Sequence, residues 1–271
     1  MATSDVRQLT ETWPSGEPPS GEPPRRTRTR QRPRRRRGFF AGLVGVVGEL
    51  MITLGVLLGL FVVWQLWWTD VEANAFQDTV LEEWQATENY VEAPSLVGEE
   101  RRDAPPVPAA GDEGDVMGVM HIPRLGEDYK RSIASGVGLD ATLNRGYIGH
   151  YPETARPGEI GNFASAAHRQ SYGAPYKEIE KVVDGDSLIV ETDDAYIVYR
   201  VTSHEIVYPD QVEVIAPVPN EVGVEPTERL ITLTTCHPLF SAAQRWITYG
   251  EFDYWVDKAD GMPAEMVEGG N

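Results

Sequence analysis

The sequence predicts an all-β folded domain that is joined, through a helical stalk, to one membrane-spanning helix. Three observations support this interpretation. A long apolar run lies near the N-terminus, at Phe39–Trp68. A segment rich in Pro, Gly and acids follows at 93–115. Beyond it, about 140 residues consist of short strand-like runs broken by Gly, Pro and Asp, a pattern typical of a β-barrel or a β-sandwich.

The charge of the 271-residue chain is unevenly distributed. The formal net charge is −18, yet residues 1–38 contain ten Arg, no Lys and only four acids. From Asp70 onward the chain has 14 bases and 37 acids. Because the basic part is a short low-complexity tail and the large remainder would repel phosphate, the charge argues against a nucleic-acid-binding protein and against a simple cytosolic enzyme.

The basic tail at 1–38 contains the pentapeptide SGEPP twice, followed by an Arg-rich run. Its Pro, Gly and charged residues offer nothing to bury, so we expect a disordered tail. The Arg cluster is expected to lie against anionic lipid on the cytoplasmic side of a membrane.

The apolar run Phe39–Trp68 has thirty residues and a single ionisable side chain, Glu49. About 20 apolar residues suffice to cross the hydrocarbon core, so the run predicts a transmembrane helix in contact with membrane lipid. Nine Arg precede it within Arg25–Arg37, whereas Asp70 and Glu72 follow it. The positive-inside rule therefore places the N-terminus in the cytoplasm and the folded domain outside the cell.

A cleaved signal peptide is the alternative interpretation, because Ala73-Asn74-Ala75 resembles a small-residue cleavage site. The apolar segment of a signal peptide has about 7–15 residues, and the run here is longer. An uncleaved anchor is therefore favoured.

Residues 69–115 are expected to form a stalk helix and a linker outside the membrane. Apolar residues recur at close to helical spacing over Val71–Val91, and the Pro- and acid-rich 93–115 follows. The folded domain is expected at 116–257, and Lys258–Asn271 is expected to be a frayed C-terminal tail.

Six runs in the folded domain have the composition of strands. A turn at Thr192-Asp193-Asp194 joins the second and third as a hairpin, and only Pro175–Val182 has a helical pattern. Closure into a barrel is plausible because it removes exposed strand edges. The six runs are Gly118–Ile122, Ser187–Glu191, Tyr196–Val207, Gln211–Ile215, Leu230–Thr235 and Trp246–Val256.

Cys236 is the only cysteine, so no intramolecular disulfide can form. A lone cysteine is often a small buried hydrophobic residue. Cys236, however, ends a predicted strand and is followed at once by His237-Pro238, which breaks the strand. A thiol at the end of a strand is accessible at the rim of a barrel, so a nucleophile and a buried filler are both possible interpretations.

A cysteine nucleophile requires a proton carrier and a group that stabilises an oxyanion. Five histidines are present, of which His121 and His204 fall within strand-like runs and are expected on solvated faces. Composition does not choose between His150 and His168. Arg245 opens the strand-like run after Cys236, so it is either a site residue or a surface charge. The spacing of His, Cys, Asp and Glu predicts no metal site, and no phosphate or dinucleotide motif predicts a cofactor.

Two segments resemble the sortase family. The first, Thr232-Leu233-Thr234-Thr235-Cys236-His237-Pro238 with Arg245 at the next strand, is similar to the Cys and Arg signature of sortases. The second, Gly161-Asn162-Phe163-Ala164 with His168-Arg169 and Tyr172–Tyr176, is similar to the family's histidine segment. Gly149–Pro152 and Cys236–Pro238 most resemble class E sortases of high-GC Gram-positive bacteria. Ala167 is a departure, since many members have Gly before the histidine.

The resemblance implies an eight-stranded β-barrel that cleaves a C-terminal LPxTG-like sorting signal between Thr and Gly. It implies that Cys236 forms a thioacyl intermediate, that His168 carries the proton, and that Arg245 stabilises the oxyanion or positions the carbonyl. Similarity to class E implies that Tyr151 helps to select Ala in an LAxTG signal, and Thr235 and His237 are further expected substrate-binding residues. The implied partners are surface proteins with sorting signals and a cell-wall or pilin amine.

Two other functions are compatible with a lone cysteine on a membrane stalk. An L,D-transpeptidase also uses Cys and His, but the Ser-His-Gly-Cys arrangement of that family is absent from this sequence. A non-catalytic surface adhesin would leave Cys236 as core filler. Thiol reactivity separates the adhesin from an enzyme, because a buried structural thiol resists small alkylating reagents.

Overall fold

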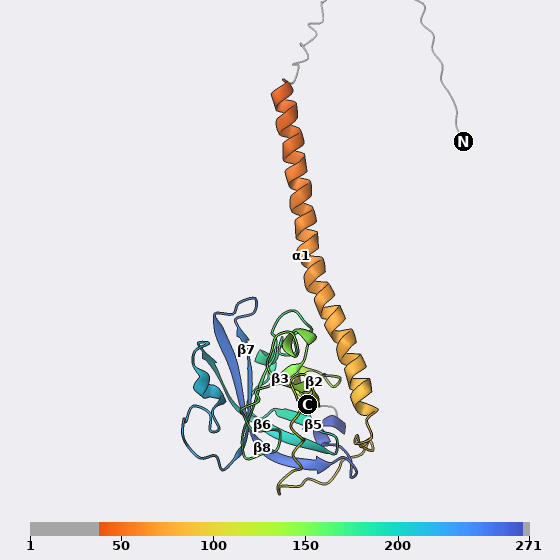
Figure 1. Cartoon of the computed structure of the whole chain (residues 1–271), viewed down its shortest axis with the longest axis vertical. Coiled ribbons are helices and arrows are strands. Elements are labelled where there is room, and N and C mark those ends of the chain that lie inside the picture. Colours follow the sequence, from red (N-terminus) through yellow and green to blue (C-terminus); the bar gives the residue numbers. More distant parts are fainter. Residues whose placement is uncertain (1–37, 268–271) are drawn as a thin grey trace, which may run out of the picture. The chain divides into compact units, whose positions relative to one another are not determined.

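The computed structural model describes residues 38–267, which form one long helix and a closed barrel of eight strands (Figure 1). The all-β class and the eight-stranded barrel are confirmed. The strand order around the barrel is β1-β2-β3-β4-β7-β8-β6-β5. The elements are α1 (Phe39–Gln85), β1 (Val116–His121), β2 (Lys130–Ser135), β3 (Ile148–His150), β4 (Gly161–Ala166), β5 (Ser187–Glu191), β6 (Ala195–Val207), β7 (Arg229–His237), β8 (Gln244–Asp257) and α2 (Ala264–Val267).

Most neighbouring strands of the barrel are antiparallel, but β2–β3 and β4–β7 are parallel. The parallel pair β4–β7 matters for the site, because the C-terminal ends of two parallel strands meet at the same rim. Strand β8 then returns antiparallel to β7 and begins at that rim. Three strand ends therefore lie together there.

The barrel interior is a continuous apolar core. The alternation of side chains along each strand turns one set inward. Strand β5 is buried along its whole length, since it lies between β1 and β6 and its outer face is covered as well. The predicted hairpin between β5 and β6 is confirmed at 192–194. Phe163, Tyr199, Ile231 and Leu233 are among the buried side chains of this core.

Parts of the predicted strand pattern are wrong. Strands β2, β3 and β4 were not among the predicted runs, because they are short and contain Ser, Asn, Gly and Ala, which carry little β propensity. The run Gln211–Ile215 is a 3-10 helix at Val212–Ile215, of which Val214 is buried. Helical structure within Pro175–Val182 is limited to a 3-10 turn at Ile179–Lys181.

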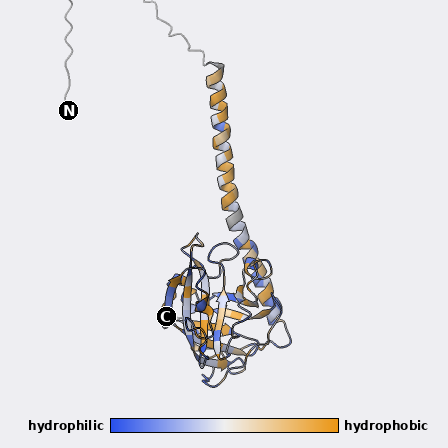
Figure 2. Cartoon of the chain, turned by 60° about the vertical axis from the view of Figure 1, so that its left-hand side comes forward, coloured by the Kyte–Doolittle hydropathy of each residue, from blue (hydrophilic) through white to orange (hydrophobic). Residues whose placement is uncertain are grey.

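Helix α1 is continuous from Phe39 to Gln85, so the expected membrane segment and stalk share one helix. It contains no Pro, and the change from apolar to polar residues near Thr69 does not interrupt the backbone. It is the one helix within 38–267 that is long and apolar enough to cross a membrane. Figure 2 shows its N-terminal part coloured as hydrophobic. The basic tail expected at 1–38 lies outside the described residues except for Gly38.

The last turns of α1 pack on the barrel, with Ala73, Val80 and Trp84 buried. Val80 contacts Ala134 of β2, and Trp84 belongs to a cluster with Val119 of β1. The stalk is therefore helical, as the apolar spacing predicts, but it is docked rather than free and it ends at Gln85 instead of Val91.

The expected linker and C-terminal tail both lie against the barrel. Residue 97 forms a β-bridge with Met262, and Arg101 forms one with Trp255. Lys258 has no exposed surface, and Glu265 of α2 accepts a hydrogen bond from Arg200. These segments are ordered because their charged residues find partners on the barrel, which composition alone does not reveal. Residues 268–271 of the expected tail lie outside the described residues.

Candidate active site

The register of three strands brings the predicted catalytic residues to one rim of the barrel. Ala166, the last residue of β4, pairs with Thr234 of β7. His168 lies two residues beyond Ala166, and Cys236, which is still within β7, lies two residues beyond Thr234, so both follow the last residue pair of the parallel strands by the same number of residues. Cys236 in turn pairs with Arg245 of β8.

Cys236 is a half-buried free thiol at this rim. Its backbone is held by Arg169, whose Nη1 donates to the carbonyl oxygen of Cys236 at 3.3 Å. The same nitrogen donates to Nδ1 of His237 at 2.9 Å, and Nη2 pairs with Glu180 at 2.6 Å. The guanidinium thus fixes the backbone that presents the thiol.

His168 is half-buried, with ring contacts on two sides. Its Nε2 lies 2.9 Å from Oδ1 of Asn144, and its ring stacks on Tyr172 with centroids 5.3 Å apart. An amide oxygen only accepts, so Nε2 carries the proton and Nδ1 is the unprotonated nitrogen of the neutral ring. Burial lowers the pKa of His168 below its usual value. The ring is therefore a neutral base at neutral pH.

Arg245 is half-buried beside its strand partner Cys236. Its Nη1 donates to the carbonyl oxygens of Ala242 and Gln244, at 3.1 Å and 2.9 Å. These bonds hold a positive charge at the mouth of the loop that joins β7 to β8. A fixed cation at this place is suited to a developing oxyanion.

The predicted substrate-binding residues differ in their surroundings. Thr235 is buried, and its hydroxyl donates to the carbonyl oxygen of Ala167 at 2.7 Å, which joins β7 to the segment that carries His168. Tyr151 is half-buried, with its hydroxyl 3.2 Å from Oγ1 of Thr234. His237 accepts a hydrogen bond from Arg169, and the centroid of its ring lies 5.7 Å from that of Trp246.

The structure distinguishes the histidines that composition left open. The Nε2 atom of His150 faces the carbonyl oxygen of Ala155 at 3.1 Å, so this ring is engaged in a turn. His121, which we expected to be solvated, pairs with Glu191 at 2.8 Å with only 13% of its side chain exposed. His204 was expected to be solvated as well, yet its Nδ1 bonds Thr248 at 3.0 Å.

Sequence reasoning missed Asn144, Arg169 and Tyr172. Arg169 and Tyr172 lie within the segment that resembles the histidine motif of sortases, so the motif itself was a usable signal. Asn144 is 24 residues before His168, in a 3-10 turn at Leu143–Arg145, and no local pattern marks it.

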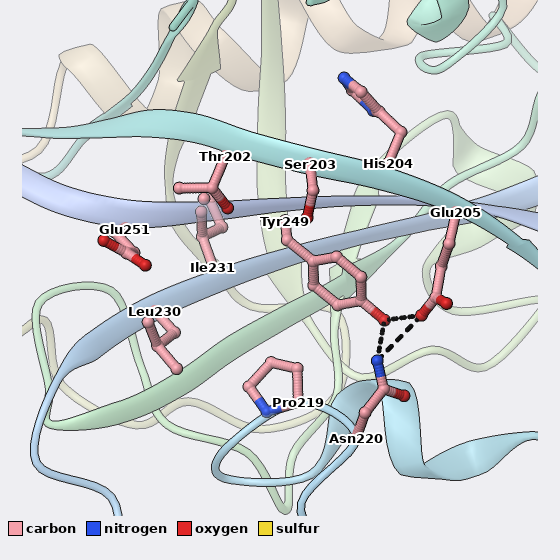
Figure 3. Close-up of a pocket in the computed structure, with 11 residues that line it drawn as sticks. Thr202, Ser203, His204, Glu205, Pro219, Asn220, Leu230, Ile231, Tyr249 and Glu251 are labelled. Carbon is pink, nitrogen blue, oxygen red and sulfur yellow. Dashed lines mark hydrogen bonds between the residues drawn. The ribbon is translucent and has the colours of Figure 1, made fainter. Parts of the chain in front are cut away.

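A separate hollow of about 350 Å³ lies on β6, β7 and β8, away from the three predicted catalytic residues, none of which lines it (Figure 3). In it, the Tyr249 hydroxyl donates to Glu205, and Asn220 donates to Glu205 at 3.0 Å and to the Tyr249 oxygen at 3.2 Å. Burial, together with Glu205, raises the pKa of Tyr249. The network ties the connection between β6 and β7 to the barrel wall.

Comparison with known proteins identifies the domain. The sortase domain family matches residues 120–253. Sortase SrtE1 of Streptomyces coelicolor is 37% identical over 227 residues, which cover 82% of this chain and 60% of that protein. Sortase SrtE2 of the same organism is 35% identical over 240 residues, covering 85% of this chain and 90% of that protein. The chain thus spans less than two thirds of the length of SrtE1 but most of SrtE2.

Solved structures agree with these relatives. The SrtA sortase from Actinomyces oris has a TM-score of 0.58 at 42% identity and covers 61% of this chain and 95% of its own. Sortase E1 from Streptomyces coelicolor, solved with a tripeptide in its active site, has a TM-score of 0.53 at 38% identity and covers 58% of this chain and 100% of its own. The resemblance to class E sortases is confirmed, and the chain belongs to the sortase family of cysteine transpeptidases.

Proposed function

We propose that this protein is a membrane-anchored sortase that cleaves an LAxTG- or LPxTG-like sorting signal between Thr and Gly and transfers the Thr carbonyl to an amine. The observation that carries the proposal is the strand register, which pairs Cys236 with Arg245 and brings His168 off the adjacent parallel strand at the same level. In the proposal, a nucleophile, a proton carrier and a cation act on one substrate carbonyl at this rim.

In the first half-reaction, His168 accepts the thiol proton, and the Cys236 sulfur attacks the Thr carbonyl carbon. The carbonyl oxygen becomes an oxyanion that Arg245 stabilises. When the C–N bond breaks, His168 gives its proton to the leaving Gly amine, and a thioester remains. The lowered pKa of His168 favours proton release to the amine.

In the second half-reaction, the amine of the acceptor attacks the thioester. His168 takes a proton from the amine nitrogen, the C–S bond breaks, and the sulfur leaves as a thiolate that recovers this proton. The products are a new amide and the starting enzyme. The acceptor is a cell-wall or pilin amine, and the donors are surface proteins with sorting signals.

Tyr151 is the proposed selector of Ala at the second position of the signal. Its half-buried ring reaches Thr234, two residues before Cys236 on the same strand. An aromatic residue that contacts the strand of the nucleophile is proposed to narrow the space for a signal side chain, which would favour Ala over the larger Pro.

The anchoring of the protein follows from α1 and its flanks. The side chains from Phe40 to Trp64 are largely exposed and apolar, as lipid contact requires. The Arg-rich run before α1 and the acids after it support a topology with the N-terminus in the cytoplasm and the catalytic domain outside the cell. Protease added to intact cells is then expected to digest the barrel. Survival of the barrel would contradict this topology.

The direct test mixes the full chain, in detergent micelles, with an LAxTG peptide or an LPxTG peptide and a glycine-based amine. Mass spectrometry is expected to show an amine adduct at the Thr carbonyl that is absent with Cys236→Ala. Preference for LAxTG is expected in the wild type and is expected to weaken in Tyr151→Ala. A folded protein that cleaves neither peptide, and whose thiol resists alkylation, would favour the adhesin interpretation.

A further inference from the structure

The two groups that hold His168 belong to two loops rather than to strands. Asn144, which accepts the Nε2 proton, lies in the 3-10 turn at Leu143–Arg145. Tyr172, which stacks on the ring, lies in the turn at 171–174. Loops depend on outside contacts for a fixed position, so the source of their support determines how well the histidine is oriented.

The turn that carries Tyr172 has an unfavourable backbone. Ser171, Tyr172 and Ala174 have φ of 61°, 51° and 39°, and Gly173 between them has φ of 74°. Residues with a Cβ are disfavoured in this left-handed region, so a run of four left-handed residues, three of which have a Cβ, persists only where neighbouring groups hold it.

One face of α1 supplies contacts to both loops. The Oδ1 atom of Asp70 accepts the N–H of Gly173 at 3.0 Å, next to Tyr172. Seven residues later, the Nε2 atom of Gln77 donates to the carbonyl oxygen of Arg145 at 3.2 Å, next to Asn144. Residues seven apart lie on the same face of a helix. The helix therefore bonds the residue beside each group that touches His168.

Ala73 lies on this face between the two polar residues and is buried against both loops. A Cβ at Gly146 would lie 3.3 Å from the Ala73 Cβ, and one at Gly173 would lie 3.4 Å from it. The two glycines therefore allow a close approach of both loops to one small helix residue. Gln77 is 2% exposed and also accepts the backbone N–H of Ser132 at 3.1 Å, which fixes its amide.

We propose that Asp70 and Gln77 of α1 are positioning residues for His168. Asp70 acts through Gly173 and Tyr172, and Gln77 acts through Arg145 and Asn144. The helix that leaves the membrane thereby sets which ring nitrogen of His168 is protonated and how far the ring is withdrawn from water. The inference rests on the proposed function of His168 as the proton carrier, and it adds a dependence of that function on the stalk.

The test measures the titration of the His168 ring by NMR in histidine-labelled full-length protein in detergent micelles, with His168→Gln used to assign the signal. Wild type is expected to titrate below the usual value of about 6.5. Asp70→Ala removes the acceptor for Gly173, which loosens the Tyr172 turn and admits water. The titration midpoint is then expected to rise, with kcat reduced by about 10-fold to 100-fold and an unchanged KM for the peptide.

Two control variants separate positioning from general damage. Asp70→Asn keeps an Oδ1 acceptor at the same place and is expected to restore the wild-type titration and kcat. Asp78→Ala removes an exposed aspartate of the same helix and is expected to change neither. A purely structural role for the helix contact would lower stability without moving the titration or kcat.

A folded Asp70→Ala variant with wild-type titration and wild-type kcat would overturn the proposal. If Asp70→Ala does not fold, Tyr172→Ala tests the same path without touching the helix, and an unchanged titration there would also overturn it. The titration needs no substrate. A wild type that cleaves no peptide would thus refute the proposed function alone, and the titration would still decide the role of the helix.

Discussion

Arg169, the residue directly after His168, donates a hydrogen bond to the carbonyl oxygen of Cys236. Two consecutive residues therefore have different proposed tasks: His168 carries the proton, and Arg169 holds the backbone of the nucleophile. His168 presents its ring at the rim, and Arg169, only 2% exposed, turns inward beneath the nucleophile.

Arg169→Ala is expected to lower both stability and activity. The substitution removes charge-assisted bonds to the Cys236 carbonyl and to His237, each worth about 1.5–3 kcal/mol. The free energy of unfolding in urea is expected to fall by at least the value of one such bond, about 1.5–3 kcal/mol. The kcat is also expected to fall, because the thiol loses its fixed position. Arg169→Lys keeps the charge but has no planar fork, so an intermediate effect is expected. Wild-type kcat in a folded Arg169→Ala protein would contradict the anchoring role.

Arg245→Ala is expected to lower kcat by about 10²–10³-fold, the usual effect of removing one oxyanion donor. The paired position of Arg245 opposite Cys236 is the reason. Steady-state kinetics with the sorting peptide measures this change. Arg124→Ala is a matched control, because Arg124 is an exposed arginine that pairs with Asp186 and lies outside the site, so its loss is expected to leave kcat unchanged. An equal loss in both variants would show that the effect is not specific to the site.

The sequence predicted the proximity of Cys236 and Arg245 better than it predicted the strands around them. The Cys236 and Arg245 pairing follows from a short loop between two apolar β runs, a local signal that the register matches. Strand β4 is rich in small and polar residues, so its propensity was too weak to show that it lies beside β7. The contact of Asn144 with His168 depends on how two loops meet in space, and no periodicity encodes it.

The stability of the protein is expected to decrease as the pH falls below about 6.5. Burial lowers the pKa of His150, His168 and His204 in the folded state. The unfolded chain binds protons at these rings near pH 6.5, whereas the folded protein resists protonation until a lower pH. Above the unfolded pKa the rings are neutral in both states, and their protonation does not affect the free energy of unfolding. As the pH falls from there through the folded pKa, the free energy of unfolding decreases.

Urea unfolding between about pH 7.5 and pH 5.5 measures this dependence, in a range above the titration of most carboxylates. The free energy of unfolding is expected to decline with pH, and the slope is expected to be smaller in His204→Gln. A free energy that stays constant, or rises toward pH 5.5, would show that these rings are as easily protonated in the folded protein as in the unfolded chain.

Lys258 is a fully buried cation after the last strand of the barrel. Its Nζ lies 2.8 Å from Oε1 of Glu191 and 3.5 Å from the centroid of the Tyr90 ring. Burial raises the pKa of Glu191, but hydrogen bonds and charge from His121 and Lys258 outweigh it and hold that pKa below its usual value. Because Tyr90 follows α1 in the chain, the contact of Lys258 with its ring joins the segment after the helix to the barrel.

Lys258→Ala is expected to destabilise the fold by about 3–5 kcal/mol, because it leaves the Glu191 carboxylate buried with one cation fewer. Lys181→Ala is the control, since Lys181 forms an exposed pair with Glu178 and should change stability by about 1 kcal/mol or less. Replacing both partners, as Lys258→Met with Glu191→Gln, removes the unpaired charge and is expected to recover part of the loss. If the single and double variants unfold at the same urea concentration, the cost does not come from an isolated carboxylate.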